Sequence, residues 1–250
     1  MTLDDETIAR FVEALQPGIE KIIDRRMEAH QAANRLKHGF GLQPGLVAPE
    51  DCDRVSEIMQ KTLAAQGEDA TMKGQSEQQE GRIARACAVN PYSPPDSWTD
   101  AEKWLMQSVF IRMIGFGHIS QASVLAGEVP ILAPYPREPM QFMEYAEGGH
   151  YGFHADDDEG NAEGRALSMG LLVDGAEEGG EFQFREVPFT APFDTQIAAR
   201  GNAIAFRPAA LHGVTTVTAG VRRSIVLWMD SLAARQAAVA AQQQAKPTGD

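Results

Sequence analysis

The sequence predicts a mainly β fold with a core of the sandwich or jelly-roll class and with helices in its N-terminal part. Two observations carry this prediction. In the first third of the chain, apolar residues recur every three to four positions, as they do in amphipathic helices. From residue 139 onward, the segments are short, rich in aromatic and β-branched residues, and separated by Gly, Pro or acidic turns. That punctuation is typical of the short strands of a sandwich or jelly roll.

Four segments predict helices: residues 7–16, 19–36, 46–66 and 98–114. The third has Pro49 where the first turn of a helix accepts proline. The fourth opens with Thr99 and Glu102 in capping-box spacing.

The stretch "RIARACAVN", residues 82–90, reads as extended, and strands are expected at 139–145, 166–174, 180–187, 202–208, 213–218 and 222–230. The Ala/Gln-rich end reads as a frayed helix followed by a loose polar tail. We therefore expect a helical support region over residues 1–80, a β core over 81–232 and a C-terminal tail over 233–250.

Composition limits the classes of function. The chain of 250 residues has a formal net charge of −13, which disfavours binding to the phosphate backbone of nucleic acid. No run of about 18 apolar residues suits a membrane span, and the acidic N-terminus lacks the apolar stretch of a secretory signal. The two cysteines, Cys52 and Cys87, form neither a metal-ligand pair nor a disulfide framework. We expect a cytoplasmic protein with no nucleic-acid or membrane partner; the sequence leaves its oligomeric state open.

The stretch "GHYGFHADDDEG", residues 149–160, raises the question of a metal site. His150 and His154 have the spacing of a zinc-protease helix, but the glutamate base is absent and the flanking glycines oppose a helix. In an extended segment, His154 and Asp156 point the same way and can reach one ion. The acids at 157–159 read as a solvated turn.

One histidine lies further along the chain, His212, and Arg222 and Ser224 follow it. Two histidines and one carboxylate on one face of an octahedral ion leave open positions, which suits non-haem Fe(II) oxygenases. An arginine inside a β-barrel is costly unless it meets an anion. A dicarboxylate co-substrate with one end on the metal would supply that anion.

Four motifs resemble one family in the right order: "YAEGGHYGFHAD" (145–156), "EEGGEFQF" (177–184), "GNAIAF" (201–206) and "LHGVTTVTAGVRRSIVLW" (211–228). With them, the stretch from Met140 to Asp230 resembles the iron- and 2-oxoglutarate-dependent dioxygenases of the prolyl 4-hydroxylase type. The resemblance implies a double-stranded β-helix that uses Fe(II), 2-oxoglutarate as co-substrate and O₂ to hydroxylate a substrate, with release of succinate and CO₂.

The resemblance also implies roles for individual residues. The iron ligands would be His154, Asp156 and His212. Arg222 would bind the far carboxylate of 2-oxoglutarate, and Tyr145 would hydrogen-bond this co-substrate. Ser224 would assist in binding the co-substrate. The carboxylate of Asp156 argues against halogenation, since related halogenases lack it. If 222–230 is a strand, Arg222 and Arg223 point to opposite faces, and the resemblance places Arg222 inside.

Other interpretations stay open at this point. A zinc-dependent hydrolase could use the same His/Asp/His set, and a noncatalytic jelly-roll binding module would need no metal. Among oxygenases, the substrate could be a peptidyl proline, an amino acid or another small metabolite. Tyr151 and Trp228 are expected to pack, and Arg165 is expected to be an exposed arginine at the start of a strand.

Overall fold

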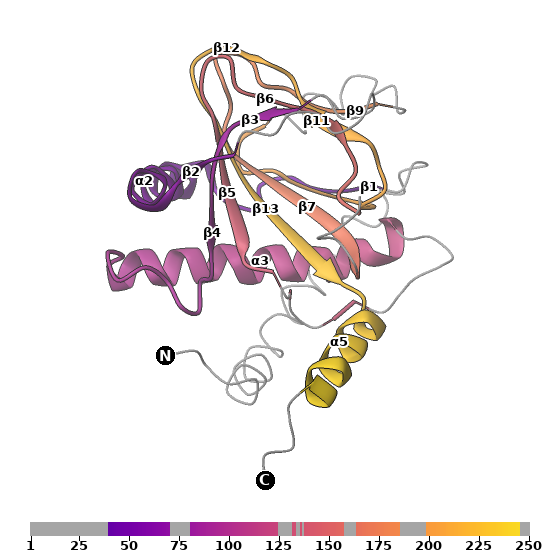
Figure 1. Ribbon diagram of the computed structural model, residues 1–250. Helices are drawn as coiled ribbons and strands as arrows, with labels where there is room; N and C mark the ends of the chain where they lie inside the picture. The colour runs from indigo at the N-terminus through magenta and orange to yellow at the C-terminus, as the bar shows by residue number, and fades with distance from the viewer. Residues whose placement is uncertain are drawn as a thin grey trace.

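Two β-sheets face each other, and helices cover the outer face of the larger one (Figure 1). The computed structural model describes residues 40–70, 81–124, 132–133, 136, 138–157, 164–185 and 199–245. The helices expected at 7–16 and 19–36, and residues 246–250 of the expected tail, lie outside the described residues. The predicted mainly β architecture is confirmed.

The larger sheet contains seven strands, and a two-stranded pair lies at one end of the fold. In spatial order the large sheet runs β1 (Phe40–Gln43), β10 (Ala203–Phe206), β7 (Arg165–Asp174), β13 (Arg222–Asp230), β5 (Met140–Tyr145), β4 (Arg85–Val89) and β2 (Glu68–Asp69). The pair is β12 (Val217–Ala219) with β8 (Glu178–Gly179).

The smaller sheet has four strands in the order β3 (Arg82–Ile83), β6 (His150–His154), β11 (His212–Val214) and β9 (Phe182–Phe184). It lies opposite the large sheet in Figure 1. The strand pairs that the structure describes are all antiparallel, so that neighbouring strands bring residues distant in sequence into register. This register assembles the candidate site described below.

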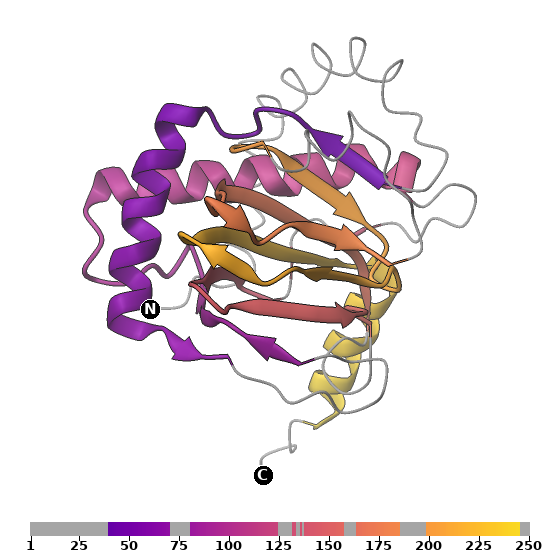
Figure 2. The same ribbon diagram turned by 90° about the horizontal axis from the view of Figure 1, so that it is seen from above.

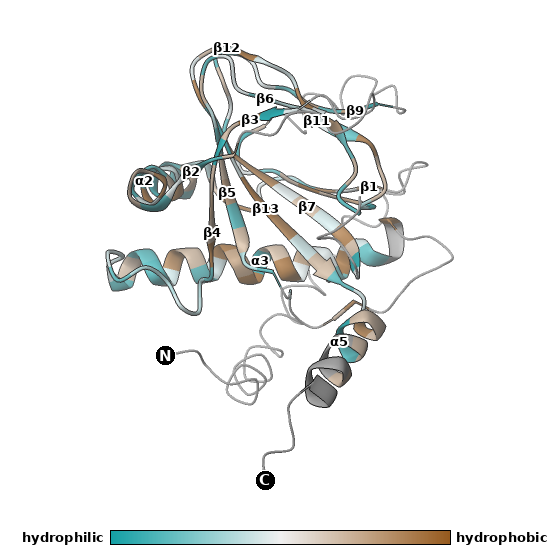
Figure 3. Cartoon of the chain, viewed as in Figure 1, coloured by the Kyte–Doolittle hydropathy of each residue, from teal (hydrophilic) through white to brown (hydrophobic). Residues whose placement is uncertain are grey.

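Helices α2 (Pro49–Gln66) and α3 (Asp100–Val124) cover the outer face of the large sheet (Figures 1 and 2). The predicted capping box begins α3: the Thr99 N–H donates to Glu102 Oε2 at 2.6 Å, and the Glu102 N–H donates to Thr99 Oγ1 at 3.3 Å. Apolar and hydrophilic residues alternate along α3 (Figure 3). Its buried side chains join those of the sheet in the main hydrophobic core, among them Met106, Val109, Phe110, Met113 and Phe116.

The N-terminal region differs from expectation in two places. Residues 68–69 form the short strand β2. Residues 40–43, inside the range expected to be helical, form β1, an edge strand of the large sheet. All four residues are buried because β10 pairs with the strand and α3 packs against it. A short strand buried on both faces shows no alternation of apolar and polar residues, so the sequence of these residues did not indicate a strand. The division of the chain at residue 80 stays a prediction.

The Ala/Gln-rich end forms α5 (Leu232–Ala245), which follows β13 directly. Across the helices that the structure describes, none combines the length and the apolar character that a bilayer crossing requires.

Candidate metal and co-substrate site

Three metal-binding side chains converge between the two sheets. His154 ends β6, Asp156 follows two residues later, and His212 begins β11. His154 Nε2 lies 3.6 Å from Asp156 Oδ1, and His212 Nε2 lies 3.7 Å from Asp156 Oδ2. The potential ligand atoms all lie within 4.8 Å of one another, and each of the three residues is less than a tenth exposed. The structure thus brings together the His-x-Asp…His set; its role as the iron site stays a prediction.

A β-bulge orients the strand that carries His154. His212 pairs with His154, and Val214 pairs with Tyr151, so three steps along β6 oppose two steps along β11. The extra residue changes the alternation of side chains. Tyr151 and His154 therefore face the same way, and their rings stack with centroids 3.5 Å apart at an interplanar angle of 12°.

Backbone carbonyls fix which nitrogen of each histidine carries the proton. His154 Nδ1 lies 2.9 Å from the carbonyl oxygen of Gly152, and His212 Nδ1 lies 2.8 Å from that of Ala210. A carbonyl can only accept, so Nδ1 is the protonated nitrogen in each neutral ring. The lone pair of each Nε2 then points toward Asp156, and this orientation of the ring is the one that metal-binding histidines need.

The electrostatics of the site favour the metal-binding protonation states. Burial by itself raises the pKa of Asp156, but His212 and His154 beside it outweigh burial and hold that pKa well below its usual range. Burial lowers the pKa of His212 to about 4, although Asp156 opposes the shift. At neutral pH an ionised Asp156 therefore faces neutral imidazole, and its Oδ2 is buried without a hydrogen-bond partner. A divalent cation between these atoms would remove that cost, so the residues fit a metal.

Arg222 lies on β13 beside Tyr145 of β5, its direct cross-strand partner. The side chain is 6% exposed, and its Nη1 donates a hydrogen bond of 2.8 Å to Ser224 Oγ. Its guanidinium carbon lies 5.7 Å from the centre of the Tyr145 ring. Burial lowers the pKa of Arg222, with Tyr145 opposing, and burial raises the pKa of Tyr145 to about 12. In the part of the chain that the structure describes, no carboxylate forms an ion pair with Arg222.

Arg223 turns to the opposite face of β13. Its Nε lies 2.7 Å from Glu144 Oε2, and its Nη1 lies 3.1 Å from Asp174 Oδ2. The two neighbouring arginines therefore differ in their partners: Arg223 is neutralised by two acids, whereas Arg222 bonds the hydroxyl of Ser224 and pairs with no acid among the described residues. The inward position of Arg222 agrees with the parity expected from the sequence.

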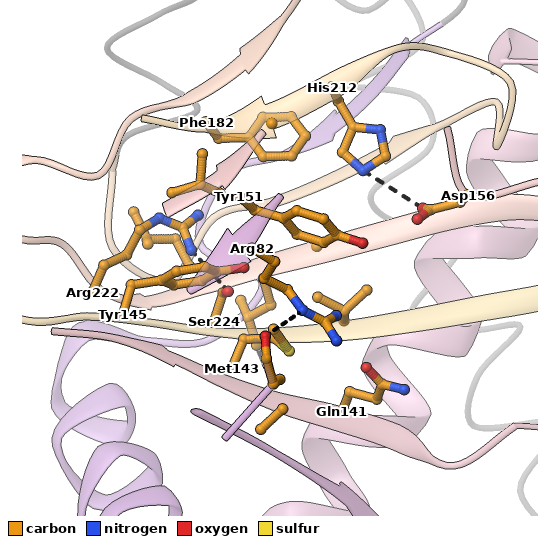
Figure 4. Close-up of a pocket in the computed structure, with 18 of the residues that line it drawn as sticks. Arg82, Gln141, Met143, Tyr145, Tyr151, Asp156, Phe182, His212, Arg222 and Ser224 are labelled. Atoms are coloured by element: carbon orange, nitrogen blue, oxygen red, sulfur yellow. Dashed lines mark hydrogen bonds and ion pairs between the residues drawn. The ribbon is translucent and has the colours of Figure 1, made fainter. Parts of the chain in front are cut away.

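A cavity of about 830 Å³ joins the metal-binding side chains to Arg222 (Figure 4). Tyr145, Tyr151, Phe182 and Ser224 line it between these two groups. All six residues expected at the site therefore border one space, although nothing in the geometry alone assigns the roles of Arg222, Tyr145 and Ser224.

Arg165 corrects an expectation. It is not an exposed arginine: its Nε and Nη2 pair with Glu138 at 2.7 and 2.5 Å, and its Nη1 donates to the backbone carbonyl of Asp156 at 2.9 Å. Its guanidinium carbon also lies 4.0 Å over the ring of Trp228, which is buried and lines the same cavity. The pairing of β7 with β13 produces these contacts, and no local sequence pattern signals them. The sequence likewise did not single out Arg82, which also lines the cavity.

Comparison with known proteins gives a consistent assignment. Residues 140–230 match the family model of the 2OG-Fe(II) oxygenase superfamily. A PKHD-type hydroxylase from Acidovorax ebreus is 32% identical over 110 residues, which is 41% of this chain and 48% of that protein. The chain thus matches about half the length of this relative.

Two solved structures share the fold. A Pseudomonas putida prolyl-4-hydroxylase is similar with a TM-score of 0.55 at 13% identity, over 78% of this chain and 93% of that one. A Trichoplax adhaerens prolyl hydroxylase, solved with a hypoxia inducible factor peptide fragment, gives 0.56 at 11% identity, over 94% and 97%. The jelly-roll core predicted from the sequence is confirmed by this likeness. Residues 140–230 of this chain are therefore similar to the 2OG-Fe(II) oxygenase superfamily, and the chain shares its fold with these two prolyl hydroxylases.

Proposed function

We propose that the chain is an Fe(II)- and 2-oxoglutarate-dependent dioxygenase that hydroxylates a substrate and releases succinate and CO₂. One observation carries this proposal. A buried arginine that has no acidic partner among the described residues borders the same cavity as a His/Asp/His set whose ligand atoms face one another. A dicarboxylate with one end at the metal and the other at Arg222 accounts for both features.

Each residue then has a defined part. His154, Asp156 and His212 would hold Fe(II) from one side and leave its remaining positions open. When bound, the iron and its co-substrate supply the oxidising chemistry. Arg222 binds the distal carboxylate through charge-assisted hydrogen bonds, and Ser224 fixes the guanidinium from the side.

The walls of the cavity complete the arrangement. The Tyr145 hydroxyl stays neutral, since burial raises its pKa to about 12, and it can donate a hydrogen bond to the co-substrate. The aromatic rings of Tyr151 and Phe182 line the space between the histidines and Arg222 and limit the access of water.

The substrate is a separate question. The names of the similar proteins support hydroxylation, and two of them are prolyl hydroxylases. A peptidyl proline, a free amino acid and another small metabolite are the candidates. The zinc hydrolase and the noncatalytic binding module are not favoured, because neither needs a buried arginine in the same cavity as the His/Asp/His set.

Succinate release tests the proposal directly. With Fe(II), 2-oxoglutarate and O₂, the protein should form succinate slowly even without its substrate, and Zn(II) should not support the reaction because zinc has no accessible redox chemistry. Asp156→Asn should abolish the activity, while Asp157→Asn should retain it because Asp157 is exposed. Hydrolysis by zinc-loaded protein, with no succinate formed by the iron-loaded protein, would establish the hydrolase instead.

A further inference from the structure

We infer that Arg82 binds a carboxylate group of the primary substrate. The inference rests on the proposed function and adds to it a chemical class of substrate. Arg82 belongs to β3, the short edge strand next to the strand that carries His154. It lines the cavity together with the metal-binding residues.

Strand pairing turns the Arg82 side chain inward. Arg82 pairs with Tyr151 of β6, and residues directly opposite each other share a face of the sheet. The guanidinium carbon of Arg82 lies 5.0 Å from the centre of the Tyr151 ring. The next residue, Ile83, is 49% exposed on the outer face. Figure 4 shows Arg82 near the middle of the cavity, below Tyr151, with Arg222 to its left.

Among the described residues Arg82 lacks an acidic partner, unlike Arg165 of the same cavity wall and unlike Arg223 on the other face of β13. Its Nε donates a hydrogen bond of 2.8 Å to the backbone carbonyl of Ala70. Arg165 pairs with Glu138, and Arg223 pairs with two acids. Within the described ranges, no carboxylate forms an ion pair with Arg82. Tyr151 does not neutralise it either, because burial, opposed by Arg82, raises the pKa of that phenol.

A count of formal charges distinguishes Arg82 from the other cations of the cavity. Fe(II), ionised Asp156, doubly charged 2-oxoglutarate and Arg222 cancel one another. Arg165 is cancelled by Glu138. With the metal and co-substrate bound, Arg82 is the cation of the described cavity wall that remains without a buried counter-charge.

Two acids of the protein also line the cavity, but they do not provide the buried counter-charge that Arg82 lacks. Glu68 and Asp69 form the short edge strand β2, and both are exposed, so water and salt screen their charges. Neither forms an ion pair with Arg82.

The chemistry of a guanidinium indicates what would complete the site. Arginine offers a planar set of donors that matches a carboxylate through two parallel hydrogen bonds, and it does so well when stacked on an aromatic ring. Arg82 already has the ring, Tyr151, and a backbone contact that holds it in place. The carboxylate can come from a free carboxylic acid, such as an amino acid, or from an acidic side chain of a peptide.

A comparison of acids with their neutral analogues tests the inference. Stimulated succinate release is measured with pooled free L-amino acids against their amides. A second arm compares end-blocked proline-containing peptides that carry Asp or Glu with the same peptides carrying Asn or Gln. In one arm, the apparent KM of the acids should be about ten- to a hundredfold lower than that of the neutral analogues. This factor corresponds to the free energy of a hydrogen bond to a charged group. The arm that responds identifies the source of the carboxylate.

Variants assign the preference to one side chain. Arg82→Gln should remove the preference for the acid, and Arg82→Lys should keep part of it. Arg85→Gln should behave as wild type, since Arg85 is a nearby half-buried arginine that does not line the cavity. The ratio of the apparent KM of the acid to that of its neutral analogue is measured on the same variant. A general loss of activity or folding affects both values and leaves this ratio unchanged.

The possible outcomes separate this inference from the proposed function. Equal stimulation by acids and neutral analogues, no stimulation in either arm, or a preference that survives in Arg82→Gln would overturn the inference alone, provided that wild type forms succinate. Wild-type protein that neither binds 2-oxoglutarate with Fe(II) nor forms succinate would overturn the proposed function itself.

Discussion

At the scale of single residues, the site depends on which face of a strand each side chain occupies. Arg222 and Arg223 are adjacent, yet one is buried against a serine and a tyrosine and the other is paired with two acids. The sequence predicted this division because successive residues of a strand face opposite sides. It did not predict the partners of Arg165 or the position of Arg82, since those depend on pairing between distant strands.

The two arginines should differ in their effect on co-substrate binding. Removing one partner of a buried charge pair costs about 2–5 kcal/mol, so Arg222→Ala should weaken 2-oxoglutarate binding by about 30-fold to several thousandfold. Arg223→Ala should weaken it less than about fivefold, because its ion pairs lie on the opposite face and are partly exposed. Anaerobic titration of the iron-loaded variants measures both, with circular dichroism as the control for folding. A larger loss in Arg223→Ala would mean that Arg223 holds the co-substrate.

At the scale of elements, the contact between β6 and β11 sets the distance between the two histidines. A Cβ atom at Gly213 would lie 2.7 Å from the backbone oxygen of Tyr151, so Gly213→Ala must move one strand away from the other. We expect the iron affinity to fall about ten- to a hundredfold, as it does for other residues that orient metal ligands. The free energy of unfolding should fall by about 1–3 kcal/mol.

A second glycine provides the control for this change. A Cβ atom at Gly115, within α3, would meet nothing within 4 Å. Gly115→Ala should therefore leave iron affinity unchanged and stabilise the protein by about 0.5–1 kcal/mol, as expected for glycine inside a helix. Iron titration and chemical denaturation of both variants give the comparison. Unchanged iron affinity in Gly213→Ala would show that strand spacing does not control the metal site.

Elements with local sequence signals could be predicted, whereas elements that depend on distant parts of the chain could not. The capping box of α3 and the extended stretch at 82–90 were predicted because their signals are local. The strand β1 was missed because its burial comes from β10 and α3, neither of which is near it in sequence. The bulge in β6 was also missed, since only pairing with β11 reveals the extra residue.

At the scale of the whole molecule, the two sheets enclose an anionic and a cationic side chain that bound ligands should stabilise. Asp156 Oδ2 is buried without a hydrogen bond, and Arg222 is buried without an acid. Fe(II) and 2-oxoglutarate together should therefore raise the melting temperature. At ligand concentrations of about 100 times Kd, one site contributes about 2.7 kcal/mol, or roughly 5–10 °C for a protein of this size.

The thermal shift has a simple control. A chelator should return the melting temperature to that of the metal-free protein, and Asp156→Asn should show little shift at the same ligand concentrations. Anaerobic thermal denaturation with and without chelator measures this. An equal shift in wild type and in Asp156→Asn would place the stabilising metal elsewhere on the protein.

The central claim is that His154, Asp156 and His212 hold one Fe(II) ion to which 2-oxoglutarate binds. The most direct measurement is the visible spectrum of the protein with Fe(II) and 2-oxoglutarate under anaerobic conditions, in wild type, His212→Ala and His150→Ala. His150 is the matched control, because it lies on the same strand as His154 and is not among the converging ligands. A metal-to-ligand charge-transfer band should be present in wild type and in His150→Ala and absent in His212→Ala. A band that survives in His212→Ala, or no band in wild type, would contradict the claim.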